Sequence, residues 1–208
     1  MHTVVQGQTL ATIGGPPCET WSAARFRELL NLAPGKKQPR PIRSSVELWG
    51  LKKLTSAEQR AIELGNALLL AMIKLLHVSW LHGTSTLMEH PSFPDRIAPE
   101  KLPPSSELLP ELQDLTSKPG IQLVRFHQCM LGAPSQKPTT FHLVNLQEVS
   151  VEIMKQENSC LCILGSRTAS QASESAHKYE PLQGLDEEGQ FKTAPAKQYP
   201  PRMNEVIA

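Results

Sequence analysis

A long amphipathic helix is the feature that most constrains how this chain can fold. We predict it over about residues 57–81, where apolar residues recur at helical spacing and cover a wide face. Two overlapping capping boxes precede it, the first formed by Thr55 and Glu58, and Gly83 follows its last turn. A helix with so wide an apolar face packs on a sheet. We therefore interpret this segment as scaffold.

Short apolar runs on either side of this helix predict the strands. The first and second predicted strands flank the long helix, which indicates one crossover between parallel strands. The last two are separated by a Gly- and Pro-containing turn, which favours an antiparallel pair. Shorter helices are predicted at 23–32 and 105–115. The four predicted strands are residues 9–13, 85–88, 121–126 and 141–144. The predicted fold class is α/β, with a parallel-leaning sheet.

Length and composition favour one domain and a tail. A chain of 208 residues is close to one domain. We place the domain at residues 1–148. Beyond it the periodic pattern weakens, and residues 166–175 are rich in Ser and Ala. We therefore predict a low-complexity, loosely ordered tail at 149–208, with a short terminal helix that begins at Pro201.

Charge and cysteine usage restrict compartment and partners. The formal net charge is only +1, so the whole chain shows no electrostatic sign of nucleic-acid binding, although basic residues cluster between 25 and 43. The four cysteines have no disulfide-framework spacing, which indicates a reducing, intracellular compartment, the nucleus included. The longest apolar run, 67–73, is too short to span a membrane, so we expect no membrane partner.

A zinc site in the second half of the chain is an alternative that we do not adopt. Cys160 and Cys162, with His177 and His142, are of the residue types that bind zinc. Their spacing is not that of a known zinc finger, so we assign no metal.

The most informative local motif is a cysteine in a stiff turn. Residues 14–17 are Gly-Gly-Pro-Pro and lead directly from the first predicted strand to Cys18. The glycines allow a sharp turn and the prolines stiffen it, so that Cys18 is presented as a candidate nucleophile. The alternative is a buried, inert cysteine beside a Pro-rich turn. A Cys-dependent hydrolase would additionally require His90 or His127 to pair with Cys18.

Residues 14–22, Gly-Gly-Pro-Pro-Cys followed after two residues by Trp-Ser, resemble the nucleophile loop of the cytosine-C5 DNA methyltransferases. The resemblance implies that Cys18 attacks C6 of cytosine and that Pro17 and Ser22 contact the substrate. Family members usually have glutamine after the cysteine, where this chain has Glu19, and often phenylalanine in place of the tryptophan. The whole loop is closer to a divergent, retroelement-like branch.

Glu89 follows the second predicted strand, where the family carries Glu-Asn-Val. The resemblance implies that Glu89 holds the flipped cytosine. Attack by a thiolate on C6 builds negative charge on the ring, and an acid at N3 relieves it. The following His90 and Pro91 depart from the family pattern.

Residues 131–140 resemble the family's Gly-x-Pro-Gln turn, which joins two strands and helps to bind DNA. The resemblance implies that Gln136, Lys137 and Thr139, together with Arg25, contact DNA or the base. The two arginines that follow the glutamine in the family are replaced here by Pro-Thr-Thr.

The resemblance covers about residues 8–145, the back half of a catalytic domain. The family's Gly-rich turn for S-adenosylmethionine has no counterpart, so cofactor-binding residues are unassigned. We expect an incomplete Rossmann-like, class I methyltransferase-like domain that uses S-adenosylmethionine on DNA, truncated or inactive, or completed by a missing half or partner chain. The alternative is a non-catalytic, decayed methyltransferase piece that binds nucleic acid or protein within a mobile-element polyprotein.

Overall fold

Five stretches of the chain are described by the computed structural model, and they form two compact units. The described stretches are residues 11–26, 39–92, 103–133, 137–157 and 199–207. The first unit contains described residues 11–26, 39–125 without 93–102, and 139–147. The second unit contains described residues 126–133, 137–138, 148–157 and 199–207.

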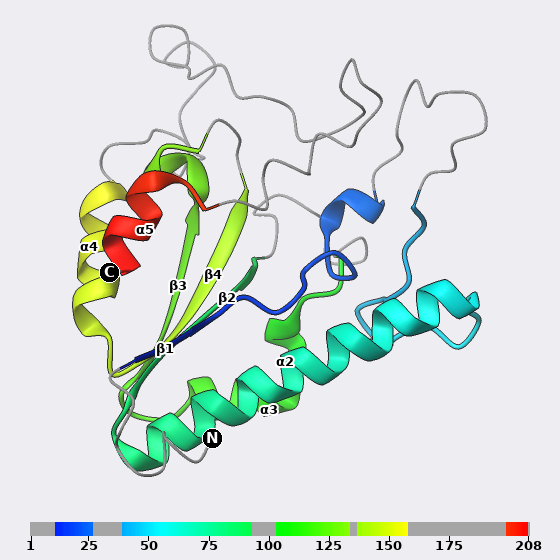
Figure 1. Ribbon diagram of the computed structural model, residues 1–208, viewed down its shortest axis with the longest axis horizontal. Coiled ribbons are helices and arrows are strands. Elements are labelled where there is room, and N and C mark those ends of the chain that lie inside the picture. The colour runs from blue at the N-terminus through cyan, green and yellow to red at the C-terminus, as the bar shows by residue number, and fades with distance from the viewer. Residues whose placement is uncertain (1–10, 27–38, 93–102, 134–136, 158–198, 208) are drawn as a thin grey trace, which may run out of the picture. The chain divides into compact units, whose positions relative to one another are not determined.

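The first unit is built on a strand–helix–strand crossover (Figure 1). Strand β1 (Ala11–Gly14) and strand β2 (Ser85–Pro91) pair in parallel, with Ala11 opposite Ser85 and Gly14 opposite Met88. Helix α2 (Ser56–His82) lies along one face of this pair. The long helix and the parallel crossover that the sequence predicts are thus present.

Local chemistry sets both ends of α2. The Thr55 side chain accepts a hydrogen bond from the Glu58 backbone N–H, and the Glu58 side chain bonds the Thr55 backbone in return, as the predicted capping box requires. Gly83 closes the helix in the left-handed region, at φ 67°, where only glycine is unstrained. By length and hydropathy alone α2 could cross a membrane, but its buried side chains pack on the sheet.

The sheet is mixed and has the order β1-β2-β4-β3. Strand β4 (Pro138–Val144) is antiparallel to β2, and β3 (Ile121–His127) lies on the far side of β4. The last strand in the sequence is therefore inserted beside the parallel pair. The fold class is α/β, as the sequence predicts.

One hydrophobic core lies under α2. Leu69 and Leu76 of α2 and Met88 of β2 are fully buried in it. Helix α3 (Pro110–Thr116), which follows the single turn η3 (Ser106–Leu108), adds Leu112 and Leu115. The predicted helix at 105–115 is thus a 3-10 turn followed by an α-helix, because Pro110 interrupts the first and begins the second.

The second unit contains three helical segments among its described residues. They are the turn η4 (Gln128–Leu131), helix α4 (Gln147–Glu157) and helix α5 (Pro201–Ile207). The terminal helix starts at Pro201, as predicted. Helix α4 is not predicted by the sequence, because its apolar positions are few and its buried side chains are limited to one narrow stripe around Ile153.

Three other elements differ in extent from the prediction. The predicted helix at 23–32 is a 3-10 turn, η1 (Ala23–Phe26), and the rest of that range lies outside the described residues. Strand β2 continues to Pro91, and β4 begins at Pro138. Pairing between these two strands, with Pro91 opposite Thr139, extends both beyond what their own sequences indicate.

Candidate functional site

Cys18 lies in a turn just beyond the end of β1. Its carbonyl accepts a hydrogen bond from the Trp21 N–H at 2.9 Å, which closes a turn over residues 18–21, called here the Cys18 turn. The thiol is not in a disulfide and is half-buried. Gly14, at the start of the loop, sits so close to Met72 of α2 that a Cβ there would overlap the Met72 sulfur. A side chain at this position would therefore require Met72 to move.

The buried side of the Cys18 turn is bound by Arg43. Its Nε donates to Thr20 Oγ1 at 3.0 Å, and its Nη1 donates to the Leu48 carbonyl at 2.5 Å. The guanidinium lies over the Trp21 ring, 4.0 Å from the ring centroid. Arg43 is 1% exposed, and burial, followed by the nearby charge of Arg25, lowers its pKa to about 10. A buried cation therefore rests directly on this turn.

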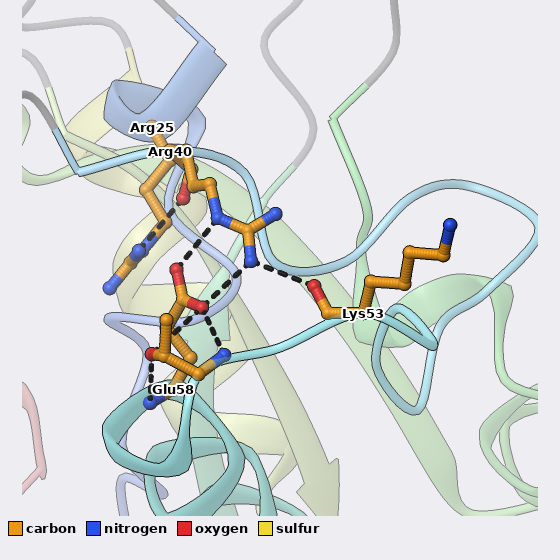
Figure 2. A network of polar contacts seen from close by, with 5 residues as sticks. Arg25, Arg40, Lys53 and Glu58 are labelled. Carbon is orange, nitrogen blue, oxygen red and sulfur yellow. Dashed lines mark hydrogen bonds and ion pairs between the residues drawn. The ribbon is translucent and has the colours of Figure 1, made fainter.

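A second arginine binds the exposed side of the turn. Arg25 donates from Nε to the Glu19 carbonyl at 2.7 Å. It also donates from Nη1 to the Arg40 carbonyl at 3.0 Å (Figure 2). Burial lowers the pKa of Arg25, while Glu58 and Glu19 oppose that shift. The side chain predicted to contact DNA is thus engaged in holding residue 19 of its own loop.

Arg40 connects this network to the start of α2. It donates to both carboxylate oxygens of Glu58, at 2.9 and 2.7 Å, and to the Lys53 carbonyl at 2.8 Å (Figure 2). These bonds, with those from Thr55, lower the pKa of Glu58 to about 2. The capping box of α2 and the Cys18 turn therefore share one hydrogen-bonded network.

Trp21 extends the cluster to β2. Its ring meets that of His90 edge to face, with centroids 5.6 Å apart. His90 is fully buried, and its Nδ1 lies 2.7 Å from the Ser106 hydroxyl. A Cys-dependent hydrolase would have to use Nε2 of this histidine, since its Nδ1 is bonded to Ser106.

Glu89 lies at the same edge of the sheet as the Cys18 turn. The register places it one residue beyond Met88, which is opposite the last residue of β1. Its side chain is 4% exposed. Side chains alternate along a strand, so Glu89 projects from the face opposite to that of Met88 and His90, which face α2 and Trp21. Glu89 thus lies inside β2, whereas the sequence placed it at the strand end.

The structure also contains a buried carboxylate that sequence reasoning missed. Glu107 accepts hydrogen bonds from Arg125 Nε at 3.0 Å and from Thr140 Oγ1 at 2.6 Å, and it pairs with Arg125 Nη2. Near it, burial lowers the pKa of His142 to about 4, with Glu107 opposing and Arg125 adding to the shift. An arginine within an otherwise apolar strand was the available sequence signal for this pair.

The remaining predicted contacts are spread between the two units. Pro17 and Ser22 flank the Cys18 turn and are half-buried. Thr139 is fully buried within β4. Lys137 belongs to the second unit, where its carbonyl accepts a bond from the Gln128 N–H at 3.0 Å. Gln136 lies outside the described residues.

The part of the chain that the structure describes holds no cluster of metal ligands and no glycine-rich turn besides Gly14-Gly15. No group of three His, Cys, Asp or Glu side chains in that part could hold a metal ion. His142 is buried in the sheet, and the other residues of the alternative zinc site are not described. The pair Gly14-Gly15, beside Cys18, is the one double-glycine turn after a described strand, so the described residues do not fit an S-adenosylmethionine site.

A separate cavity of about 460 Å³ lies in the second unit. Its lining includes none of the residues predicted for the site. The lining residues are Leu131, Glu152, Arg202, Glu205 and Val206.

Comparisons with protein-family models, curated proteins and solved structures gave no match to this chain.

Proposed function

We propose that this chain is an incomplete, Rossmann-like cytosine-C5 methyltransferase-like domain that acts on DNA through Cys18. The observation that carries the proposal is the β1–α2–β2 crossover, in which the Cys18 turn follows β1 and Glu89 lies in the parallel partner strand β2, one residue beyond its pairing with β1. In open α/β sheets, ligands bind beyond the carboxyl ends of parallel strands. The motif resemblance supplies the reaction.

In the proposed reaction, the Cys18 thiolate forms a bond to C6 of cytosine, and Glu89 supports the charge that develops at N3. The cytosine has to leave the duplex first, because C6 is inaccessible within the base stack. S-adenosylmethionine would supply the methyl group when bound. Since the described residues do not fit it, we propose that a further segment or partner chain holds it.

The first step can be tested without a methyl donor. Addition of the thiolate to C6 makes C5 basic, so C5 takes up deuterium from D₂O, and elimination of Cys18 returns cytosine with deuterium in place of hydrogen. We expect the full chain to catalyse this exchange in a cytosine-containing single strand. Cys18→Ser should abolish it, Glu89→Gln should slow it about 100-fold, and Cys129→Ser should leave it unchanged.

Covalent trapping gives a second measurement. With S-adenosylmethionine, the segment or partner chain that holds it and a 5-fluorocytosine oligonucleotide, the wild-type chain and Cys129→Ser should form an adduct that survives denaturing electrophoresis. Exchange or adduct that persists in Cys18→Ser would reject Cys18 as the nucleophile. Absence of both from the wild type would reject the activity for this chain by itself.

The second candidate is a non-catalytic module of a mobile-element polyprotein that binds nucleic acid or protein. It is favoured by Arg25, whose guanidinium is engaged within the chain, and by Thr139, which is buried. This candidate predicts that Cys18→Ser binds a fluorescent oligonucleotide as the wild type does, with neither protein catalysing exchange.

A further inference from the structure

Arg43 is a buried cation that has no carboxylate partner among the described residues. It is 1% exposed, and its contacts are the Thr20 hydroxyl, the Leu48 carbonyl and the Trp21 ring. Its Nη2 has no acceptor among the described residues. Burying a charge without an opposite charge is costly. The stability of the fold is therefore a poor reason for an arginine at this position.

The contacts of Arg43 converge on the Cys18 turn. Thr20 and Trp21 are the third and fourth residues of that turn, and Arg43 binds both. Gly65 of α2 closes over the pair, since a Cβ at this position would lie 3.4 Å from Arg43 Nη2 and from Thr20 Oγ1. The turn is thereby fixed between the segment that carries Arg43, helix α2 and, through Trp21, His90 of β2.

Charge adds to geometry at this position. Arg25 binds the carbonyl of residue 19 and Arg43 binds the side chain of residue 20, so two guanidinium groups contact the two residues that follow Cys18. Neighbouring arginines favour the thiolate form of a cysteine, which is its nucleophilic form.

We propose that Arg43 is a positioning residue for Cys18: its guanidinium fixes the Cys18 turn and supplies positive charge that stabilises the Cys18 thiolate. This inference rests on the proposed nucleophilic role of Cys18 and adds the residue that prepares its thiol.

The test is the pH profile of Cys18 alkylation in the full chain. Iodoacetamide reacts from about pH 6 to 10, and mass spectrometry of the Cys18 peptide separates this thiol from the other cysteines. We compare wild type with Arg43→Met, Arg43→Lys and, as the matched control, Arg40→Met. Arg40 lies three residues away in the same segment, and its side chain does not bind the Cys18 turn.

We expect Arg43→Met to raise the midpoint of the profile by about one pH unit. The thiolate fraction near pH 7 then falls up to about tenfold, while a more basic thiolate is about threefold more nucleophilic, so the rate at pH 7 falls about threefold. Arg43→Lys should raise the midpoint less than Arg43→Met does. Lysine keeps the positive charge but cannot bond both the Thr20 hydroxyl and the Leu48 carbonyl as the guanidinium does. Arg40→Met should match wild type.

A folded Arg43→Met chain with the wild-type profile, or an equal shift in Arg40→Met, would overturn the proposal. If Arg43→Met does not fold, Thr20→Val replaces it. That change removes one contact at nearly constant shape, and an unchanged profile would again overturn the proposal. Alkylation needs neither DNA nor cofactor. A shift in Arg43→Met without base exchange in the wild type would thus reject the methyltransferase chemistry and keep the role of Arg43.

Discussion

Two arginines in the first unit are held in opposite ways. Arg125, whose side chain is about half-exposed, pairs with the buried carboxylate of Glu107, which also accepts a bond from Thr140. Arg43 is fully buried and is held by an aromatic ring, a hydroxyl and a carbonyl. The first arrangement neutralises charge and joins β3, β4 and η3. The second leaves a buried positive charge against Thr20 and Trp21 of the Cys18 turn, and the stability of a core gives no reason for it.

The largest effect should come from removing the carboxylate of the neutralised pair. Glu107→Ala leaves Arg125 without its partner and the buried Thr140 hydroxyl without its acceptor, so we expect a loss of about 3 kcal/mol of unfolding free energy. Urea denaturation measures it. Glu111→Ala, on the exposed face of α3, is the control and should cost less than about 0.5 kcal/mol. Equal losses of unfolding free energy in Glu107→Ala and Glu111→Ala would show that the contact of Glu107 with Arg125 does not stabilise the fold.

Acid should weaken the same region through His142. Its pKa in the folded chain is about 4, against about 6.5 when unfolded, so between these values the unfolded chain binds the extra proton. The free energy of unfolding should thus fall by about 2–3 kcal/mol from pH 6.5 to pH 4. His142→Asn should flatten this part of the curve. A wild-type curve that is already flat there would show that His142 is protonated within the fold.

Replacing Arg43 should cost less than removing Glu107. Arg43→Met loses two hydrogen bonds and the contact with Trp21, but it also removes a buried charge, so we expect a loss of only about 1 kcal/mol. Urea denaturation of this variant beside Glu107→Ala tests the order. A loss above that of Glu107→Ala would mean that Arg43 serves stability first.

The smallest effect is expected at Gly65. Gly65→Ala raises helix propensity by up to about 1 kcal/mol, and the added methyl just touches Arg43 Nη2 and Thr20 Oγ1. We expect a gain in thermal stability of less than about 1 kcal/mol, measured by calorimetry. A clear loss would show that the packing around Arg43 tolerates no displacement.

Most helices and strands of the first unit could be predicted from the sequence, because they depend on residues that are close together in the chain. The start and end of α2 follow from Thr55, Glu58 and Gly83, each acting within one helical turn. The four strands follow from short runs of apolar and β-branched residues. Helix α4 escaped prediction because its apolar positions are few, and the full lengths of β2 and β4 depend on their pairing.

The sequence by itself thus determined the long helix and its caps, the existence of the four strands, the α/β class and the presence of Cys18 in a turn after a strand. Only the tertiary structure decided that Arg43 contacts that turn, that Glu107 binds Arg125 and Thr140, and that β4 lies between β2 and β3. Capping and turn formation are set by interactions within a few residues. The partner of a buried charge, in contrast, is chosen among groups 18 to 33 residues apart, and the packed core alone brings them together.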